Sequence, residues 1–325
     1  MMIKYATIGT SLIAEQFVTG ANATGKMQLS AVYSRSSHTG LAFAKKFGCN
    51  KVYTSLDSLA SDDNVDAVYV ASPNAFHVEQ SEFLLESGKH VICEKPIATS
   101  AAEYVRLKKL ADSRGLIYME AIIPMYNPSR SRIKAALGEI GNICMAKIDY
   151  CQRSSRYDRF VKGEHVNIFD MSLYAGTLMD LGVYCIYAAV DLFGMPNGIK
   201  ATANFLYNGA DGSGIAIFEY DDFSASLTYS KTGQSVAPTE IVGDSGSVVM
   251  ETAVYYQDAY LIKHGQKQPL FDHISKETLM GCEAAAFCDY IDGNDLDKYA
   301  QNSEICLKVH TCMDKIKQEA NIIYK

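Results

Sequence analysis

The sequence lacks an excess of basic residues. Its 325 residues include 30 Lys and Arg against 37 Asp and Glu, which gives a formal net charge of -7. A surface of that sign does not neutralise phosphate groups, which argues against nucleic acid and anionic membranes as partners. A nucleotide cofactor is still allowed, because a helix terminus and a few local cations suffice to bind one. The expected partner is therefore a small molecule.

Long apolar runs and targeting signals are also missing. No segment reaches the roughly 18 uninterrupted apolar residues that a membrane-spanning helix needs. The N-terminal stretch MMIKYATIG has one Lys and a short strand-like run, without the apolar region and cleavage site of a signal peptide. We therefore expect a cytoplasmic protein.

The nine cysteines form no C-x-x-C pair, and the seven histidines are isolated along the chain. These spacings do not match those of structural zinc sites. The pattern predicts reduced and mostly buried thiols, as in the reducing cytosol, and no metal ion.

The first third of the sequence alternates between short apolar runs and stretches of helical period. Runs that are apolar at successive positions are typical of parallel strands buried on both faces. Ser100 and Glu103 form a capping-box pattern that predicts a helix start. This alternation predicts a doubly wound parallel sheet. The predicted strands are 3–8, 29–33, 67–71, 90–93 and 116–119.

The pattern changes after residue 121. One helix is predicted in NPSRSRIKAALGEIG, and the strands that follow alternate apolar and polar residues, as in FSASLTYS, which predicts antiparallel pairing with one exposed face. From about Met280 the sequence returns to helix. We expect a dinucleotide-binding domain over 1–121 and an α+β domain with a large open, mostly antiparallel sheet over 122–325. Chemistry is expected between the two domains, and dimerisation or higher homo-oligomer formation through the second sheet.

The turn after the first strand reads Gly9-Thr10-Ser11-Leu12-Ile13-Ala14. In a dinucleotide-binding turn the first glycine makes the tight turn, the second admits the pyrophosphate, and a small residue at the third position allows close helix packing. Gly9 and Ala14 fill the first and third roles, and the small Ser11 stands at the second. The motif alone does not distinguish a phosphate site from an ordinary strand–helix junction.

The end of the second strand indicates the type of cofactor. A carboxylate there would bind the ribose of NAD, whereas an arginine accommodates the 2′-phosphate of NADP. The sequence has Ser34 and Arg35 and no acid at this point. It therefore favours NADP over NAD, although NAD remains possible.

Two further stretches follow predicted parallel strands and should lie at the carboxyl edge of the sheet, where ligands bind in such folds. The first is ASPNAFH and the second is ICEKPIATS. The polar and loop residues they contribute to the predicted cofactor site are Ser72, Asn74, His77, Glu94, Lys95 and Pro96.

With these motifs the chain resembles the glucose–fructose oxidoreductase and inositol dehydrogenase family, often written Gfo/Idh/MocA. The resemblance covers essentially the whole chain and includes SPNAFH, EKP, MEA at Met119–Ala121 and MDLGVY at Met179–Tyr184. EKP followed 85 residues later by D-x-G-x-Y is the most specific feature. The family implies a Rossmann domain and a second domain with an open antiparallel sheet.

The resemblance also implies roles for individual residues. Lys95 would lie between nicotinamide and substrate, with Asn74 and Glu120 around the nicotinamide and its ribose. Asp180 and Tyr184 match the second-domain motif, in its tyrosine form shared with dimeric dihydrodiol dehydrogenase. Two positions depart from the family pattern: Ala175-Gly176 replaces a double glycine, and Asn127 stands where many members carry Arg.

Hydride transfer from an alcohol requires a base that takes the hydroxyl proton. A tyrosine has a pKa near 10, and a neighbouring ammonium favours its phenolate. Tyr184 is therefore expected as the acid/base, Lys95 as its activator, and Asp180 as the group that orients either the substrate hydroxyl or Lys95. Two functions remain open: an NAD(P)-dependent oxidoreductase acting on a sugar, polyol or dihydrodiol, and a non-catalytic dinucleotide-binding regulator on the same fold.

Overall fold

The computed structural model describes residues 2–324, which form two compact units. The first unit contains the chain up to Tyr126 together with Ser275–Ser303, and the second contains Asn127–Ile274 together with the chain from Glu304 onward. These units differ from the domains expected from the sequence chiefly in the segment Ser275–Ser303, which packs in the first unit.

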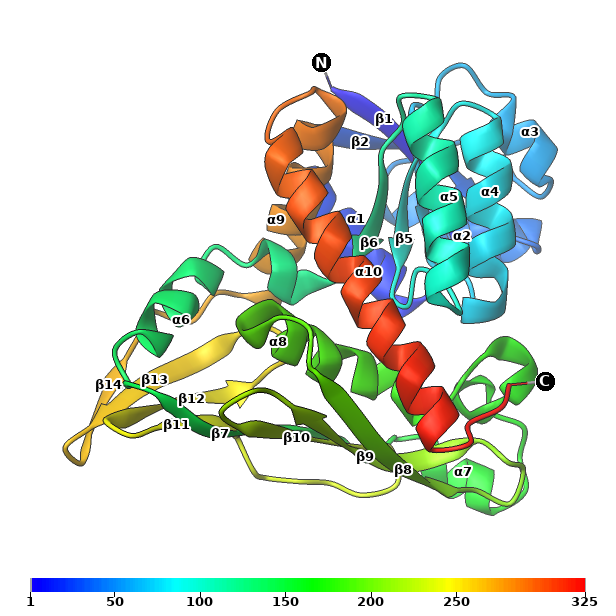
Figure 1. Cartoon of the computed structure of the whole chain (residues 1–325). Coiled ribbons are helices and arrows are strands. Elements are labelled where there is room, and N and C mark those ends of the chain that lie inside the picture. The colour runs from blue at the N-terminus through cyan, green and yellow to red at the C-terminus, as the bar shows by residue number, and fades with distance from the viewer. Residues whose placement is uncertain (1, 325) are drawn as a thin grey trace. The chain divides into compact units, whose positions relative to one another are not determined.

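The first unit contains a sheet in which every strand pairing is parallel (Figure 1). All five strands predicted there are confirmed within a few residues. The short β3 was not predicted, because two residues carry no periodicity. The strand order is β3-β2-β1-β4-β5-β6, with β1 at Ile3–Ile8, β2 at Met27–Tyr33, β3 at Val52–Tyr53, β4 at Ala67–Val70, β5 at His90–Glu94 and β6 at Tyr118–Ala121.

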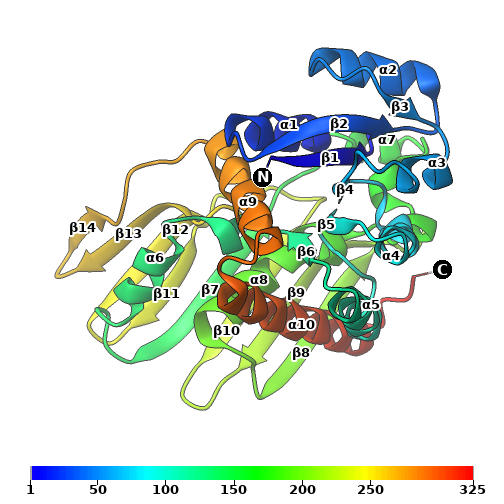
Figure 2. The same ribbon diagram turned by 90° about the horizontal axis from the view of Figure 1, so that it is seen from above.

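Helices cover both faces of this sheet, since all four residues of β4 are buried and successive side chains of a strand point to opposite faces. α4 packs beside α5, as Figures 1 and 2 show. Ser100 caps α5 by accepting a hydrogen bond from the Glu103 amide at 3.3 Å, which confirms the predicted helix start. The helices are α1 (Leu12–Ala23), α2 (Ser37–Lys46), α3 (Leu56–Ala60), α4 (His77–Glu86), α5 (Ala101–Ser113) and α9 (Lys276–Ile291), with short 3₁₀ turns at Asn74–Phe76 and Ile123–Tyr126.

The helix α9 belongs to the first unit because it packs tightly on α1. A Cβ atom placed on Gly20 of α1 would lie 2.8 Å from the backbone nitrogen of Gly281 in α9. Two glycines thus allow the helix backbones to approach closely. Lys26 also binds Asp289 at 2.6 Å. These contacts join residues more than 250 positions apart, so the sequence pattern did not reveal them.

The second unit contains a mixed, mostly antiparallel sheet of eight strands. β10 was expected to be antiparallel to its neighbours; it is antiparallel to β9 but parallel to β7. Its alternation is as predicted, with Ala225 and Leu227 buried. The order is β14-β13-β12-β11-β7-β10-β9-β8, over Ile143–Cys151 (β7), Gly198–Phe205 (β8), Asp211–Glu219 (β9), Ser224–Ser230 (β10), Thr239–Gly243 (β11), Gly246–Thr252 (β12), Gln257–Lys263 (β13) and Gln266–Pro269 (β14).

Two helices of the second unit, α6 (Arg130–Leu137) and α8 (Val183–Phe193), lie on one face of this sheet (Figures 1 and 2). The buried carboxylate of Asp191 in α8 joins them, because Arg130 Nε lies 3.0 and 2.9 Å from its two oxygens. Tyr256 also donates a hydrogen bond to Asp191 at 3.1 Å. A buried carboxylate that is fully paired in this way fixes α8 on the sheet.

The segment Met171–Phe193, which includes α8, is long and apolar enough to cross a membrane by length and composition. However, 72% of its most apolar window is buried in the folded chain. That degree of burial is typical of the core helix of a soluble protein.

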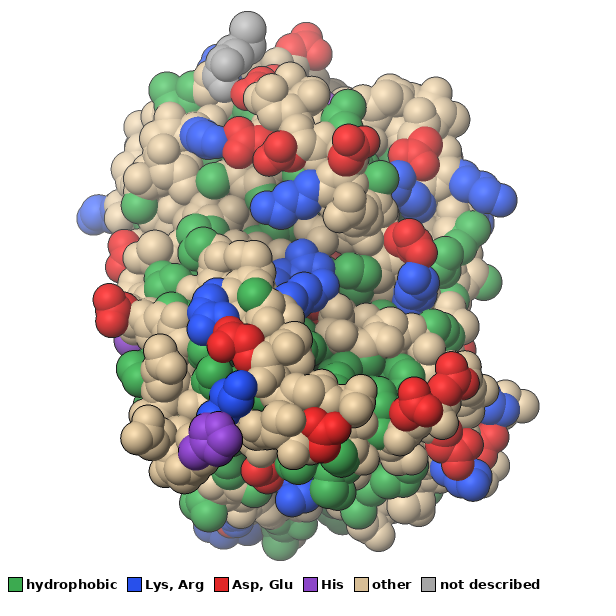
Figure 3. All heavy atoms as spheres, turned by 60° about the vertical axis from the view of Figure 1, so that its left-hand side comes forward, with side chains coloured by type: hydrophobic (Ala, Val, Ile, Leu, Met, Phe, Trp, Pro, Cys, Tyr) green, Lys and Arg blue, Asp and Glu red, His purple; other side chains and the backbone are tan. Residues whose placement is uncertain are grey.

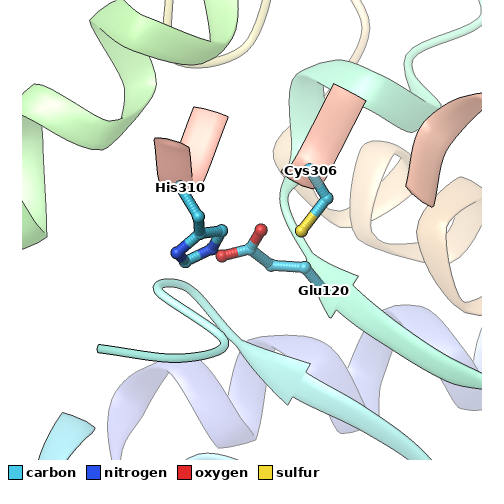
Figure 4. Close-up of side chains that lie close together, drawn as sticks. All are labelled: Glu120, Cys306 and His310. Carbon is cyan, nitrogen blue, oxygen red and sulfur yellow. The ribbon is translucent and has the colours of Figure 1, made fainter. Parts of the chain in front are cut away.

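A short helix α7 (Tyr157–Val161) and the long helix α10 (Leu296–Glu319) complete the fold. Cys306 and His310 are one turn apart on α10 and both are buried (Figure 4). On the face shown in Figure 3, acidic and basic side chains are interspersed among polar and apolar ones.

Candidate functional site

The predicted cofactor residues of the first unit follow the carboxyl ends of its parallel strands. Gly9 follows β1, Ser34 follows β2, Ser72 follows β4, and Glu94 closes β5. The strand order reverses between β1 and β4, which are neighbours in the sheet. In open parallel sheets, ligands bind at the carboxyl edge beside such a reversal.

Gly9 is required at its position by both conformation and space. Its φ is +107°, a region that side chains with a Cβ rarely adopt. A Cβ atom there would lie 2.6 Å from the carbonyl oxygen of Ala71, at the end of β4. The turn after β1 therefore packs directly against the end of the neighbouring strand β4.

Ser11 is the N-cap residue of α1, with φ -79° and ψ 171°. Any residue adopts this conformation, so the serine in place of a second glycine introduces no strain. Within the described residues its side chain makes no capping hydrogen bond. The first amides of α1 thus keep their capacity to bind an anion. Leu12, the first residue of the helix, is 69% exposed, while Thr10 and Ile13 are half-buried.

At the end of β2, Arg35 is exposed and Ser34 is half-buried. The Ser34 hydroxyl accepts a hydrogen bond from the amide of Ser36 at 3.3 Å, and Ser36 caps α2. Arg35 thus extends from a turn whose backbone is fixed on both sides. This is the position at which a 2′-phosphate would be bound.

The loop that carries Lys95 is held from several sides. His77 is buried, and its ring nitrogens lie 2.9 Å from the carbonyl oxygen of Pro96 and 2.8 Å from that of Ser72. Both nitrogens are thus engaged by backbone oxygens of the two loops. We therefore assign His77 to holding the loops, and a direct contact between His77 and a cofactor stays a prediction.

Glu120 and Tyr118, both in β6, hold the residue that follows Pro96. A carboxylate oxygen of Glu120 accepts the amide hydrogen of Ile97 at 2.8 Å, and Tyr118 donates to the Ile97 carbonyl at 3.2 Å. Figure 4 shows the Glu120 side chain projecting from β6. The peptide bond between Lys95 and Pro96 is cis. Lys95, which is half-buried, thus precedes a residue that two hydrogen bonds from β6 hold in place.

Glu94 precedes Lys95 and accepts a hydrogen bond from Tyr69 at 2.6 Å. Burial raises the pKa of Glu94, while this hydrogen bond and the charge of Lys95 oppose the rise. Glu283 of α9 is a second buried carboxyl in this region, and burial raises its pKa well above the usual value. Its Oε1 atom has no hydrogen-bond partner within residues 2–324. The sequence analysis did not identify Glu283, because an isolated Glu on a helix is ordinarily a surface residue.

Ser72 and Asn74 lie in the loop after β4. The Ser72 hydroxyl donates to Gln80 of α4 at 2.7 Å, and Asn74 begins a 3₁₀ turn. The first unit thus brings the predicted cofactor residues together at one sheet edge. The residues are Gly9, Thr10, Ser11, Leu12, Ile13, Ser34, Arg35, Ser72, Asn74, His77, Glu94, Lys95, Pro96 and Glu120.

In the second unit, Asp180 and Tyr184 lie on a continuous helical segment. Asp180 is in a π-helical turn at Leu178–Gly182, and Tyr184 is in the first turn of α8. Such turns insert an extra residue into a helix and occur frequently at functional sites. Both side chains are half-buried. Tyr184 meets the ring of Tyr150 edge to face, with ring centres 5.8 Å apart.

The carboxylate of Asp211 fixes the start of this segment. It is buried and accepts the amide hydrogen of Leu178 at 2.6 Å. A Cβ atom on Gly176 would clash with the same carboxylate, so the second position of the family's double glycine has no room for a side chain. Burial raises the pKa of Asp211 to about 6.

A buried lysine also contacts the predicted catalytic aspartate. Lys231 Nζ lies 2.5 Å from Asp180 Oδ2. The sequence analysis missed Lys231 and Asp211, since both are distant in sequence from the D-x-G-x-Y motif. Asn127, the other departure from the family pattern, is buried and donates to the carbonyl oxygens of Tyr255 and Tyr256 at 2.6 and 3.1 Å.

Comparison with known proteins agrees with this arrangement. Residues 3–122 match the family model described as "Oxidoreductase family, NAD-binding Rossmann fold", and residues 132–249 match the GFO/IDH/MocA C-terminal domain. The scyllo-inositol 2-dehydrogenase (NADP(+)) IolU of Bacillus subtilis is 38% identical over 99% of this chain and 98% of its own length. The trans-1,2-dihydrobenzene-1,2-diol dehydrogenase of Macaca fuscata fuscata is 26% identical over 95% of this chain and 89% of its own.

Solved structures show the same fold. A 3-ketoreductase from Actinomadura kijaniata in complex with NADP and TDP-benzene has a TM-score of 0.87, with 23% identity and 98% of both chains covered. A levoglucosan dehydrogenase in complex with NADH and levoglucosan has a TM-score of 0.80, with 16% identity and 98% coverage of both chains.

These matches confirm three predictions made from the sequence: the Rossmann domain followed by a mostly antiparallel sheet, the family, and the class of NAD(P)-dependent oxidoreductase. The two family models together cover most of the chain, and the similarity to the Bacillus subtilis dehydrogenase extends over 99% of it. The chain therefore belongs to the Gfo/Idh/MocA family of oxidoreductases.

Proposed function

We propose that this protein is an NADP(H)-dependent dehydrogenase that interconverts a hydroxyl and a carbonyl group on a sugar, a cyclic polyol or a dihydrodiol-like compound. The observation that carries the choice of cofactor is the exposed Arg35 at the end of β2, where an NAD enzyme would have a carboxylate. The relative from Bacillus subtilis, which is named as NADP(+)-dependent, supports the same choice.

The residues at the sheet edge fit a dinucleotide. The pyrophosphate would be bound by the backbone after Gly9 and by the first amides of α1, where the Ser11 side chain makes no capping hydrogen bond. Arg35 would bind the 2′-phosphate with its guanidinium group, which donates several hydrogen bonds in one plane. Asn74 and the Glu94–Pro96 loop would bind the nicotinamide end.

Once bound, the nicotinamide accepts or supplies the hydride. The rigid loop between Glu94 and Ile97 would hold the Lys95 ammonium against the reacting oxygen of the substrate, where a fixed positive charge stabilises the developing alkoxide. Tyr184 would take the hydroxyl proton during oxidation and return it during reduction. Asp180 would accept a hydrogen bond from a substrate hydroxyl and so set its orientation. These roles follow from the family resemblance and the local geometry of each unit.

We also propose a cytoplasmic homodimer formed through the eight-stranded sheet. The register places Met145 of β7 and Ile215 of β9 on the same face of that sheet, and they are 42% and 47% exposed. Light scattering over a range of concentrations tests the dimer, and a monomer at high concentration would contradict it.

The function is tested by incubating the purified protein with NADP⁺ or NAD⁺ and a panel of polyols, aldoses and dihydrodiols, while following the absorbance of the reduced cofactor. We expect turnover of at least one class, faster with NADP⁺. A protein that binds NADPH but turns over no member of the panel in either direction would favour the non-catalytic regulator.

A further inference from the structure

Lys231 is held in place by its own backbone. It follows β10 directly, and its amide donates to the carbonyl oxygen of Gly212 at 3.0 Å. Its carbonyl oxygen accepts the amide hydrogen of Ser154 at 2.9 Å. The residue is 4% exposed. The backbone at Lys231 is therefore held by β9 on one side and by the loop after β7 on the other.

The Lys231 side chain is buried, and its ammonium group ends beside the carboxylate of Asp180. Its Nζ lies 5.8 Å from the centre of the Phe169 ring and 2.5 Å from Asp180 Oδ2. The lysine side chain is 5% exposed, whereas that of Asp180 is 39% exposed. Burying an ammonium group is costly unless a carboxylate compensates it.

This asymmetry separates the pair from an ordinary surface ion pair, in which both groups are solvated, and from a core pair, in which both are buried. Here the cation is internal and the carboxylate remains accessible on a π-helical turn. The buried ammonium group of Lys231 thus supports the accessible carboxylate of Asp180.

We propose that Lys231 is a positioning residue of the reaction: it keeps the carboxylate of Asp180 ionised and fixes its Oδ2 atom, so that Asp180 can accept a hydrogen bond from a substrate hydroxyl. The proposal rests on the proposed function of Asp180. In this scheme Asp180 is not the group that takes up the hydroxyl proton, because the lysine side chain paired with it favours the charged carboxylate.

Other titratable groups surround the pair. Burial raises the pKa of Tyr150 of β7, and the charge of Asp180 adds to this rise. The ring of Tyr184 in α8 packs edge to face on Tyr150. Asp211 of β9 is close enough for the Lys231 charge to favour its ionised form. Removing Lys231 would therefore remove a positive charge that favours the ionised forms of both Asp180 and Asp211, and we expect Asp180 to take up a proton at a higher pH.

The proposal is tested with Lys231→Met, which keeps the length of the stem, and Lys231→Arg, which keeps the charge. In Lys231→Met we expect KM to rise about tenfold or more, and the acid limb of the pH profile of kcat/KM to move up by about one pH unit. In Lys231→Arg the acid limb of the kcat/KM profile should return most of the way to its wild-type pH. The control is Lys134→Met, which also removes a lysine bound to a carboxylate of this unit, Asp191, while Arg130 stays paired with it.

A second measurement does not depend on turnover. The Asp180 carboxyl can be followed by carbon-13 NMR in protein labelled at aspartate, with Asp180→Asn to assign the signal. We expect the titration of this carboxyl to move to higher pH in Lys231→Met and not in Lys134→Met. An unchanged titration, or an unchanged KM and pH profile in an active Lys231→Met variant, would overturn the proposal. If the wild type proves inactive, the proposed function fails while the NMR result still decides whether Lys231 controls Asp180.

Discussion

The carbonyl oxygen of Ala71 lies 2.6 Å from the point that a Cβ atom of Gly9 would occupy. This contact joins the ends of β1 and β4, the two strands between which the order of the sheet reverses. The path of the turn at Gly9 is therefore determined by backbone atoms, which cannot move aside as a flexible side chain can.

Gly9→Ala should weaken the binding of NADPH by about tenfold or more, since the turn must shift away from β4 and the first amides of α1 move with it. The measurement is titration of NADPH fluorescence. Gly25→Ala is the matched control, because Gly25 also has positive φ but a Cβ there meets no described atom within 4 Å. Equal losses of NADPH affinity in both variants would show that backbone strain alone, and not the close packing of the Gly9 turn on Ala71, weakens binding.

Arg35→Ala should weaken NADPH binding by about tenfold to a hundredfold and leave NADH binding nearly unchanged, because only NADPH carries the 2′-phosphate. Affinities for both cofactors are measured by the same titration. Arg114→Ala is a suitable control, since Arg114 is an exposed arginine at the C-terminal end of α5. A similar loss for both cofactors would refute the role of Arg35.

Lys95→Met should abolish turnover and leave NADPH affinity within about a factor of three, since the loop is held by His77, Glu120 and Tyr118 rather than by the ammonium. Single-turnover rates of Lys95→Met, Tyr184→Phe and the double variant show whether the two residues act as a unit. In that case the double variant loses no more than the worse single variant. Wild-type rates in Lys95→Met would remove Lys95 from the mechanism.

The raised pKa of Asp211 predicts that the stability of the folded chain depends on pH. Its pKa is about 6 in the folded chain, above the usual 3.8. Between these values the folded state keeps a proton that the unfolded state has released, so this group's contribution to stability is complete below pH 4 and is lost as the pH rises through 6. The loss amounts to about 3 kcal/mol at 1.36 kcal/mol per pH unit.

Urea unfolding of the wild type and Asp211→Asn near pH 4 and pH 7 measures this contribution. The free energy of unfolding of Asp211→Asn should lack the decrease that Asp211 causes in the wild type. Asp222→Asn, at an exposed aspartate of the same unit, should follow the wild type. Parallel pH profiles for the wild type and Asp211→Asn would contradict the assignment of a raised pKa to Asp211.

The sequence was most informative where the signal is local. Buried parallel strands appear as short apolar runs, and the residues directly after them, such as Gly9 and Lys95, must then lie at one edge of the sheet. Local capping chemistry also identified the start of α5 at Ser100. The roles of these residues in binding and catalysis remain predictions.

The features missed are those created by contacts between distant parts of the chain. Lys231 reaches Asp180 across 51 positions, and Asp211 reaches the amide of Leu178 across 33. The parallel pairing of β10 with β7 and the packing of Gly20 on Gly281 are likewise invisible to periodicity. Charged residues in such places look like surface residues until the fold shows that they are buried.

The most direct test of the account is equilibrium binding of NADPH and NADH to the wild-type protein, measured by cofactor fluorescence and repeated with Gly9→Ala. We expect saturable binding, tighter for NADPH than for NADH, that is weakened in Gly9→Ala. Absence of binding for both cofactors, or binding that is unaffected by Gly9→Ala, would contradict the placement of the cofactor at the carboxyl edge of the first sheet.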